Sequence, residues 1–432
     1  MKPIIKSENR QKWVNVALCA LMIFFCLGFC SSNKSLYLTA ITEALDIKRS
    51  AYSLATSCRF VTTSVINMFF GALVYKFGSK KLIMAGFVCL IGSVLLNSVA
   101  TNVYMFCVSE ALSGIAFSWS GTAMVGAIIN RWCKENTGTI MGAVLSANGI
   151  GGAIAAQIVT PIIYQESNAF GYRDAYRLIA VLLAVVAVIM LILFRDKSRE
   201  EINSQPAKVK KKYRGRAWVG ITFNDARHTV YFYGAAVCIF LTGMSLHAKG
   251  AIASAHMLDN GISPEFVALV ASISSLSLTG TKLLSGFLFD KLGLRKTISI
   301  CCIAAVIGMF LLAFITNSPI GKVSGIAYAI FSALALPLET VMLPLYAGDL
   351  FGQKAYNKMM GLFISINTAG YAVGGPFINF GFEKFGSYTP MLIILGCIMI
   401  AVLVGMQFVI TSAHHVRDIV MAKAEEEGLA EN

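Results

Sequence analysis

Runs of about 20 apolar residues alternate with short polar segments along almost the whole chain. Such a run is long enough to cross the hydrocarbon core of a bilayer as a helix. Twelve runs of this kind lie near residues 14–37, 51–75, 82–100, 103–130, 138–163, 178–194, 229–255, 265–288, 297–316, 322–347, 358–381 and 389–411. The pattern therefore predicts an all-α membrane protein with twelve transmembrane helices.

The composition supports this prediction and excludes several other classes. Of the 432 residues, 56% are hydrophobic and only 13% are charged, whereas about a quarter are charged in soluble proteins. The first apolar run lacks a small-residue cleavage site, so we expect it to remain as the first span. Eleven cysteines are spread through the spans, which implies neither disulfides nor a metal site. We expect no cofactor.

The basic residues are distributed unequally between the two sides of the predicted spans. The two ends of the chain and alternate loops hold 26 of the 36 Lys and Arg residues, and the opposite loops hold 6. This asymmetry predicts a multi-pass protein of the cell membrane with both termini in the cytoplasm. The basic residues are scattered over many loops, so the net charge of +14 does not predict nucleic-acid binding.

One motif occurs twice, at residues 71–81 (GALVYKFGSKK) and 286–296 (GFLFDKLGLRK). The same offset of 215 positions pairs Gly28 with Gly243 and Lys34 with Lys249. A duplicated membrane protein is expected to place its site between the repeats. We therefore divide the chain into an N-terminal six-helix half (1–194), a cytoplasmic central loop (195–227), a C-terminal six-helix half (228–412) and a cytoplasmic tail (413–432).

Glycines are concentrated in the fifth and eleventh predicted spans. Gly149, Gly151 and Gly152 lie in the fifth, and Gly370 and Gly374 lie in the eleventh. Small residues let helix backbones approach closely. Tight packing and a gating hinge are both open interpretations at this point.

The repeated motif resembles the signature of the major facilitator superfamily, G-x-L-x-D-R/K-x-G-R/K-R/K. The resemblance implies a transporter with two pseudo-symmetric halves and a cytoplasmic gate built from the two loops. The gate residues that it implies are Gly71, Lys76, Gly78, Lys80, Gly286, Asp290, Lys291, Gly293 and Arg295. The first copy departs from the signature because Tyr75 stands at its acidic position. The alternative is that the lysines only anchor the loops to lipid headgroups.

Three passages also resemble the monocarboxylate porters and the oxalate/formate exchangers. They are GFCSSNKSLYLTAITEALDI, RWCKENTGTIMGAVLSANGIGG and HMLDNGISPEFVALVASISSLSLTGTKLLSGFLFDKLG. This resemblance implies a small organic anion as the substrate. It further implies substrate contacts at Lys282, where such families often carry arginine, and at Asn367, where dicarboxylate exchangers tend to carry lysine.

Three lysines lie inside predicted spans, where charge is expensive and usually functional. Lys34 and Lys249 occupy matching places in spans one and seven, and two ammonium groups there would attract an anion. Snorkelling toward the outer headgroups is the alternative. Lys282 lies eight residues before Asp290, or about 12 Å along a helix, so we interpret it as a substrate or coupling site.

Arg59 and Glu110 are charged residues in spans two and four, and we expect them to form an ion pair. A buried carboxyl beside a base can also titrate, which makes Glu110 a candidate proton carrier. His247 is interpreted as an exposed histidine at the outer mouth. Glu339 lies between Pro337 and Pro344 in span ten, which we expect to be a helix kinked by these prolines, and the sequence indicates no partner for it.

These observations favour a secondary active transporter of a small organic anion, first of all a monocarboxylate, coupled to protons or a counter-anion. No ATP-binding loop or catalytic motif such as HExxH or GxSxG occurs, so an enzyme is not expected. Efflux of amphipathic or cationic compounds by the same fold is the alternative, and a membrane sensor without transport ranks below it. Since both halves lie in one chain, a monomer can form the working unit.

Overall fold

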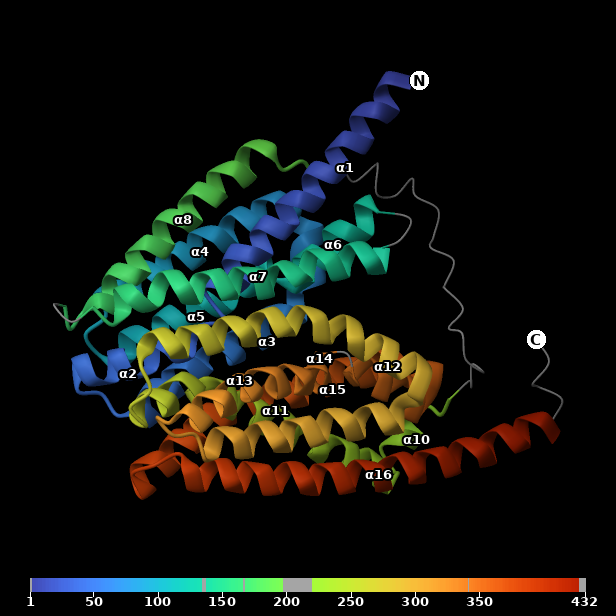
Figure 1. Cartoon of the computed structure of the whole chain (residues 1–432). Coiled ribbons are helices and arrows are strands. Elements are labelled where there is room, and N and C mark those ends of the chain that lie inside the picture. Colours follow the sequence, from blue (N-terminus) through green and yellow to red (C-terminus); the bar gives the residue numbers. More distant parts are fainter. Residues whose placement is uncertain (1, 134–136, 166–167, 197–219, 341, 427–432) are drawn as a thin grey trace.

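The computed structural model describes residues 2–133, 137–165, 168–196, 220–340 and 342–426. The chain folds into two helical bundles that lie side by side, coloured blue to green and yellow to red in Figure 1. Each bundle holds six of the twelve predicted spans. The predicted all-α membrane fold with two six-helix halves is confirmed.

The first span of the N-terminal half is interrupted near its middle. Helix α1 (Lys2–Ile23) continues into a π-helical turn, η1 (Phe24–Phe29), and α2 (Lys34–Leu45) begins after a short break. The remaining helices of this half are α3 (Arg49–Phe77), α4 (Ser79–Val99), α5 (Val103–Ser120), α6 (Thr122–Trp132), α7 (Thr137–Ile163) and α8 (Gly171–Leu193). Helices α5 and α6 together make the fourth span.

The C-terminal half uses longer helices that contain internal breaks. Its helices are α10 (Phe223–Ala226), α11 (Val230–Asp259), α12 (Pro264–Ala313), α13 (Pro319–Ala335), α14 (Pro337–Thr340), α15 (Met342–Phe385) and α16 (Thr389–Glu426). Gly293 divides α12 into the eighth and ninth spans, and Gly352 divides α15 into the end of the tenth span and the eleventh.

Nine segments of the described chain are long and apolar enough to cross a membrane by composition alone. The other three predicted spans are α3, the first part of α12 and the second part of α15. These three helices lie where the halves meet, because α3 packs on α15 and α7 packs on α12. One face of each of these helices therefore contacts the other half of the molecule instead of lipid.

Glycines allow two close helix crossings at matching places in the two halves. A Cβ on Gly28 would lie 2.7 Å from the Cα of Gly151 in α7, and one on Gly243 would lie 2.5 Å from the carbonyl of Asn367 in α15. Gly28 and Gly243 are a pair in the internal repeat. The repeat is therefore visible in the packing. In the eleventh span a Cβ on Gly370 or Gly374 would lie 2.4 Å from a backbone carbonyl of α11, so of the two roles considered for the glycines of the fifth and eleventh spans the structure displays tight packing.

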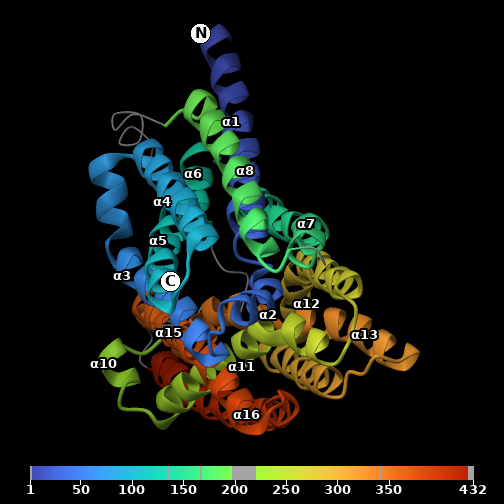
Figure 2. The same ribbon diagram turned by 90° about the vertical axis from the view of Figure 1, so that its left-hand side faces the viewer.

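The two halves are joined at the end of the molecule opposite to where α1 begins and α16 ends, here called the far end (Figures 1 and 2). There the guanidinium of Arg49 donates two hydrogen bonds to Asp259, of 2.5 and 2.8 Å, and stacks 4.4 Å from the ring centroid of Phe382. Burial raises the pKa of Tyr388, so this hydroxyl keeps its proton and donates to Asn379 at 2.5 Å. We call this group the far-end cluster.

Other hydrogen bonds also join the two halves between the far end and the middle of the molecule. Ser35 and Ser254 are joined at 3.0 Å between their Oγ atoms, and the Ser57 hydroxyl donates to the carbonyl of Ala372 at 2.6 Å. Within the described chain, the bond nearest to the termini joins Thr279 to the Ser146 carbonyl at 3.2 Å. That bond lies near the middle of α7 and α12, so the halves are held together from the far end to mid-height.

Candidate functional site

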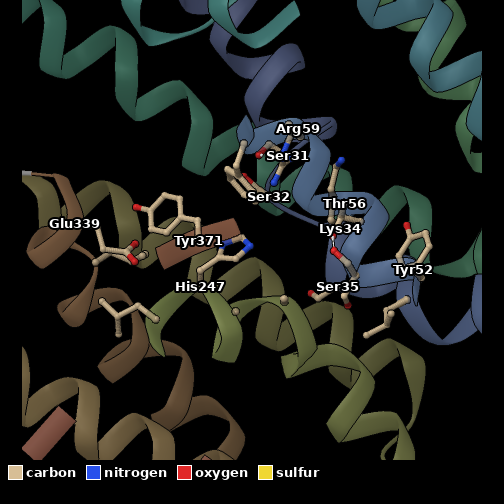
Figure 3. Close-up of a pocket in the computed structure, with 17 residues that line it drawn as sticks. Ser31, Ser32, Lys34, Ser35, Tyr52, Thr56, Arg59, His247, Glu339 and Tyr371 are labelled. Carbon is tan, nitrogen blue, oxygen red and sulfur yellow. Dashed lines mark hydrogen bonds between the residues drawn. The ribbon is translucent and has the colours of Figure 1, made fainter. Parts of the chain in front are cut away.

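A cavity of about 330 Å³ lies between the halves near the middle of the molecule (Figure 3). This volume is within the range that binds small molecules. Its wall comes from α2, α3, α11, α14 and α15 and from the break in the first span. The lining residues are Ser31, Ser32, Lys34, Ser35, Leu38, Tyr52, Ser53, Thr56, Arg59, Phe60, Leu246, His247, Gly250, Ala251, Leu336, Glu339 and Tyr371.

The break in the first span positions the polar wall of the N-terminal half. Asn33 donates from its side chain to the Gly152 carbonyl at 2.8 Å, and Ser32 donates to Asn148 at 2.9 Å. Both partners lie on α7, whose glycines permit this close approach. The bonds hold Ser31, Ser32 and Lys34 at the cavity.

Lys34 forms an ion pair with Glu110 of α5, and its ammonium contacts both carboxylate oxygens. The Glu110 side chain is 2% exposed and that of Lys34 is 21% exposed. The sequence predicted Arg59 as the partner of Glu110, and the structure places Lys34 there instead. An acid and a base in neighbouring helices can be recognised from sequence, whereas the choice between two bases depends on side-chain reach and helix rotation.

Among the described residues, Arg59 is the cation lining this cavity that forms no salt bridge with a carboxylate. Its residue is 7% exposed, its Nη1 donates a long 3.4 Å bond to Ser31, and its guanidinium lies 4.6 Å from the ring centroid of Phe60. In the described part of the chain, no carboxylate forms a salt bridge with it. A buried guanidinium that lacks a partner is costly and has donors free to bind an anion.

The wall of the C-terminal half carries His247, Tyr371 and Glu339. The His247 ring stacks on Tyr371 at 5.2 Å between centroids and meets the edge of Phe60 at 4.7 Å. The expectation of an exposed histidine at the outer mouth is wrong, because His247 lies in the cavity and contacts rings from both halves. Figure 3 shows the Tyr371 hydroxyl directed toward Glu339, whose Oε1 is buried without a hydrogen bond.

Lys249 lines a second lobe of about 230 Å³. The two lobes share Ser32, Ser35, Leu246, Gly250 and Leu336, so they adjoin. Lys249 is 2% exposed and donates to the Ser332 hydroxyl at 2.8 Å. Lys249 therefore corresponds to Lys34 in the repeat. The two lysines differ in their partners: Lys249 binds a hydroxyl of the tenth span, whereas Lys34 binds a carboxylate of the fourth span.

The other two predicted substrate contacts have different outcomes. Asn367 is 2% exposed, donates to the Ile239 carbonyl at 3.4 Å, and packs against Gly243. It is therefore part of the contact between α15 and α11 and lines neither lobe. Lys282 belongs to α12, but its side chain lies outside the described residues.

The repeated motif forms turns at its two central glycines. Gly78, with φ of 79°, separates α3 from α4, and Gly293, with φ of 75°, separates the two parts of α12. The backbone amide of Ser79 donates to Asp196 at 2.6 Å, and Asp196 pairs with Arg131 at 3.5 Å. Asp196, which follows α8, thus stabilises the start of α4. This first copy of the motif has Tyr75, near the end of α3, at its acidic position.

The structure describes only some of the remaining predicted gate residues. Arg295 donates to Gln407 at 2.6 Å within the C-terminal half, and Lys76, Lys80 and Lys291 lie on helices near the same turns. The environments of Gly71, Gly286 and Asp290 lie outside the described residues. Their predicted role as a gate stays a prediction.

Comparisons with known proteins place this geometry in a family. The model of the Major Facilitator Superfamily matches residues 20–248 and 235–428. Two crystal structures of the nucleoside transporter NupG superpose with TM-scores of 0.75 and 0.71, at 12% and 14% identity, over 91% and 92% of this chain and 99% and 98% of theirs. This likeness shows the fold.

The names of curated relatives refer to several different kinds of substrate. The sialic acid transporter NanX of Escherichia coli is 25% identical over 77% of this chain and 79% of its own length. Monocarboxylate transporter 13 of Rattus norvegicus is 23% identical over 79% and 75%. Multidrug resistance protein 2 of Bacillus subtilis is 23% identical over 90% and 95%. The relatives are transporters and not enzymes, and this chain is a secondary transporter that belongs to the Major Facilitator Superfamily.

Proposed function

We propose that the chain transports a small organic anion, and first of all a monocarboxylate, by proton symport or anion exchange. The carboxylate binds to Arg59 in the cavity between the halves. The observation that carries this proposal is a buried guanidinium that lines the cavity and forms no salt bridge with any described carboxylate. Arginine suits this role because its planar fork binds a carboxylate through two parallel hydrogen bonds.

The charge balance of the cavity supports an anion over a cation. The described groups that line the two lobes, together with Glu110, comprise three cations (Lys34, Arg59 and Lys249) and two carboxylates (Glu110 and Glu339). With both acids ionised the empty site keeps one positive charge, which attracts a monoanion. A cationic drug would be repelled by this excess positive charge, so export of cations is disfavoured.

We place the protein in the cell membrane with both termini in the cytoplasm, as the distribution of basic residues indicates. In this orientation the far-end cluster closes the outer side, and the described form faces inward. Transport then requires the two halves to separate at the far end and to meet at the other end. Each chain contains a complete cavity, which favours the monomer as the working unit.

The test is a thermal-shift measurement followed by uptake into proteoliposomes. The probes are L-lactate, sialic acid, uridine and ethidium, which represent a monocarboxylate, a larger acid, a neutral nucleoside and a cationic drug. A carboxylate that binds the folded protein raises its Tm. We expect this shift and the corresponding uptake in the wild type, and their loss in the Arg59→Gln variant.

Two controls separate binding from folding. Arg177→Gln removes a guanidinium that pairs with Asp174 at the surface, where both side chains are about half exposed, and should leave uptake unchanged. Arg59→Lys keeps the charge but loses the fork, so partial affinity is expected. Carboxylate binding of wild-type strength in Arg59→Gln would contradict the proposal, as would a shift with ethidium alone.

A further inference from the structure

We propose that Glu339 is the group that binds the coupling proton, so that the transporter takes up its anion together with a proton. This inference rests on the proposed function, because it assumes a carboxylate at Arg59. It goes beyond that function by choosing symport over exchange and by assigning the proton to one residue. The observation behind it is a cavity-lining carboxyl with a buried oxygen that lacks a hydrogen bond.

The two acids of the site have different surroundings. Both oxygens of Glu110 contact the Lys34 ammonium, so protonation of Glu110 would leave that ammonium without its partner. Glu339 forms no salt bridge with any described residue, and its Oε1 is unsatisfied. Glu339 can therefore change its protonation state without breaking an ion pair, whereas Glu110 cannot.

The position of Glu339 lets it respond to an anion in the cavity. It lies on α14, the short helix that begins at Pro337 after the tenth span is interrupted, and Figure 3 shows its carboxylate beside Tyr371 and facing the space next to His247. Arg59 lies on the opposite wall of the same cavity. A carboxylate bound to Arg59 thus shares a low-dielectric space with Glu339.

The charged and titratable groups around this space favour an ionised Glu339 when the site is empty. The cations are Arg59 on α3, Lys34 on α2 and Lys249 on α11; Lys34 is already neutralised by Glu110. His247 and Tyr371 complete the set, together with Tyr328 and Tyr52 in the walls, and the described lining residues of α12 are uncharged. An empty site is balanced best with Glu339 ionised, because two cations then face one carboxylate.

A bound monoanion changes this balance. It adds a second negative charge opposite Arg59, and repulsion between the two carboxylates favours the protonated form of Glu339. Linkage is reciprocal, so a proton on Glu339 must strengthen anion binding by the same factor. The site consequently loads an anion and a proton together and releases them together, with no covalent step.

The experiment measures proton movement and anion affinity in one preparation. Full-length protein is reconstituted into vesicles that contain a pH-sensitive dye, and L-lactate or sialic acid is added, whichever raises the Tm of the wild type. We expect internal acidification during uptake. We also expect wild-type affinity to rise as the pH falls, by up to about tenfold per pH unit for one linked proton.

The Glu339→Gln variant mimics the permanently protonated acid. We expect it to bind the anion at every pH as tightly as the wild type does at low pH, to exchange anions, and to move no protons. Glu339→Asp keeps a titrating group and should retain coupling. Glu265→Gln removes an exposed acid at the start of α12 and should behave like the wild type.

Two results would overturn the inference. One is anion-driven acidification that persists in Glu339→Gln together with a wild-type pH profile. The other needs no variant and therefore does not depend on its folding: a wild type that takes up the anion without any proton. A wild type that neither binds nor transports a carboxylate contradicts the proposed function itself, so the two failures are distinguishable.

Discussion

At the scale of single residues, the Lys34–Glu110 pair joins the break in the first span to α5. Its acid is almost fully buried, and removal of one partner from a buried pair leaves an uncompensated charge. We expect Glu110→Gln to lower the free energy of unfolding by about 3–5 kcal/mol. Lys34→Met should also destabilise, and the double variant should cost much less than the sum of both. Unfolding in SDS measures these values, and additive costs would rule out direct coupling.

The residues of the site could be found from the sequence more easily than their partners. Lys34, Arg59 and Glu110 are recognisable because charge inside an apolar span is costly and is kept for a reason. Their pairing was not predictable, since it depends on the rotation of α2, α3 and α5 about their axes. His247 was misplaced for a related reason. Distance along a helix estimates depth, but the contacts of its ring with Phe60 and Tyr371 depend on how the two halves meet.

At the scale of helices, the sequence predicted the number and order of the spans but only one of their interruptions. The twelve apolar runs and the 215-residue repeat lead to the two bundles. The π-helical turn η1 was not predicted, whereas the short helix α14 begins at Pro337, one of the two prolines that predict a kink in span ten. Interruptions of this kind depend on tertiary contacts, such as the bond from Asn33 to the Gly152 carbonyl, that compensate for lost helical hydrogen bonds.

Gly78 tests the role of the repeated motif at this scale. Its φ of 79° and ψ of 158° are accessible to glycine and strained for other residues. We expect Gly78→Ala to lower the free energy of unfolding by roughly 1–3 kcal/mol. Gly92→Ala is the matched control in the same half, because Gly92 is helical and a Cβ there meets no atom within 4 Å. Alanine there should stabilise the helix by about 0.5–1 kcal/mol, and equal effects of the two changes would remove the case for strain at Gly78.

At the scale of the whole molecule, the halves behave as two bodies whose contact at the far end must open during transport. Ser35 of α2 and Ser254 of α11 meet across this contact, with 3.0 Å between their Oγ atoms. Cysteines at both positions should form a disulfide on oxidation, since serine hydroxyls this close bring the Cβ atoms near bonding range. We expect the oxidised Ser35→Cys/Ser254→Cys variant to stop transporting and a reductant to restore uptake.

A second pair of serines provides the control for this disulfide. Ser93 and Ser109 lie within the N-terminal half, with 2.9 Å between their Oγ atoms, so a Ser93→Cys/Ser109→Cys bridge joins helices that move together. Uptake should survive oxidation of this variant, and each single cysteine should transport under both conditions. If the halves did not separate at the far end, the bridge between Ser35 and Ser254 would be as harmless as the internal one. Selective arrest by the bridge between the halves is therefore the result that alternating access requires, because only that bridge crosses the contact that has to open.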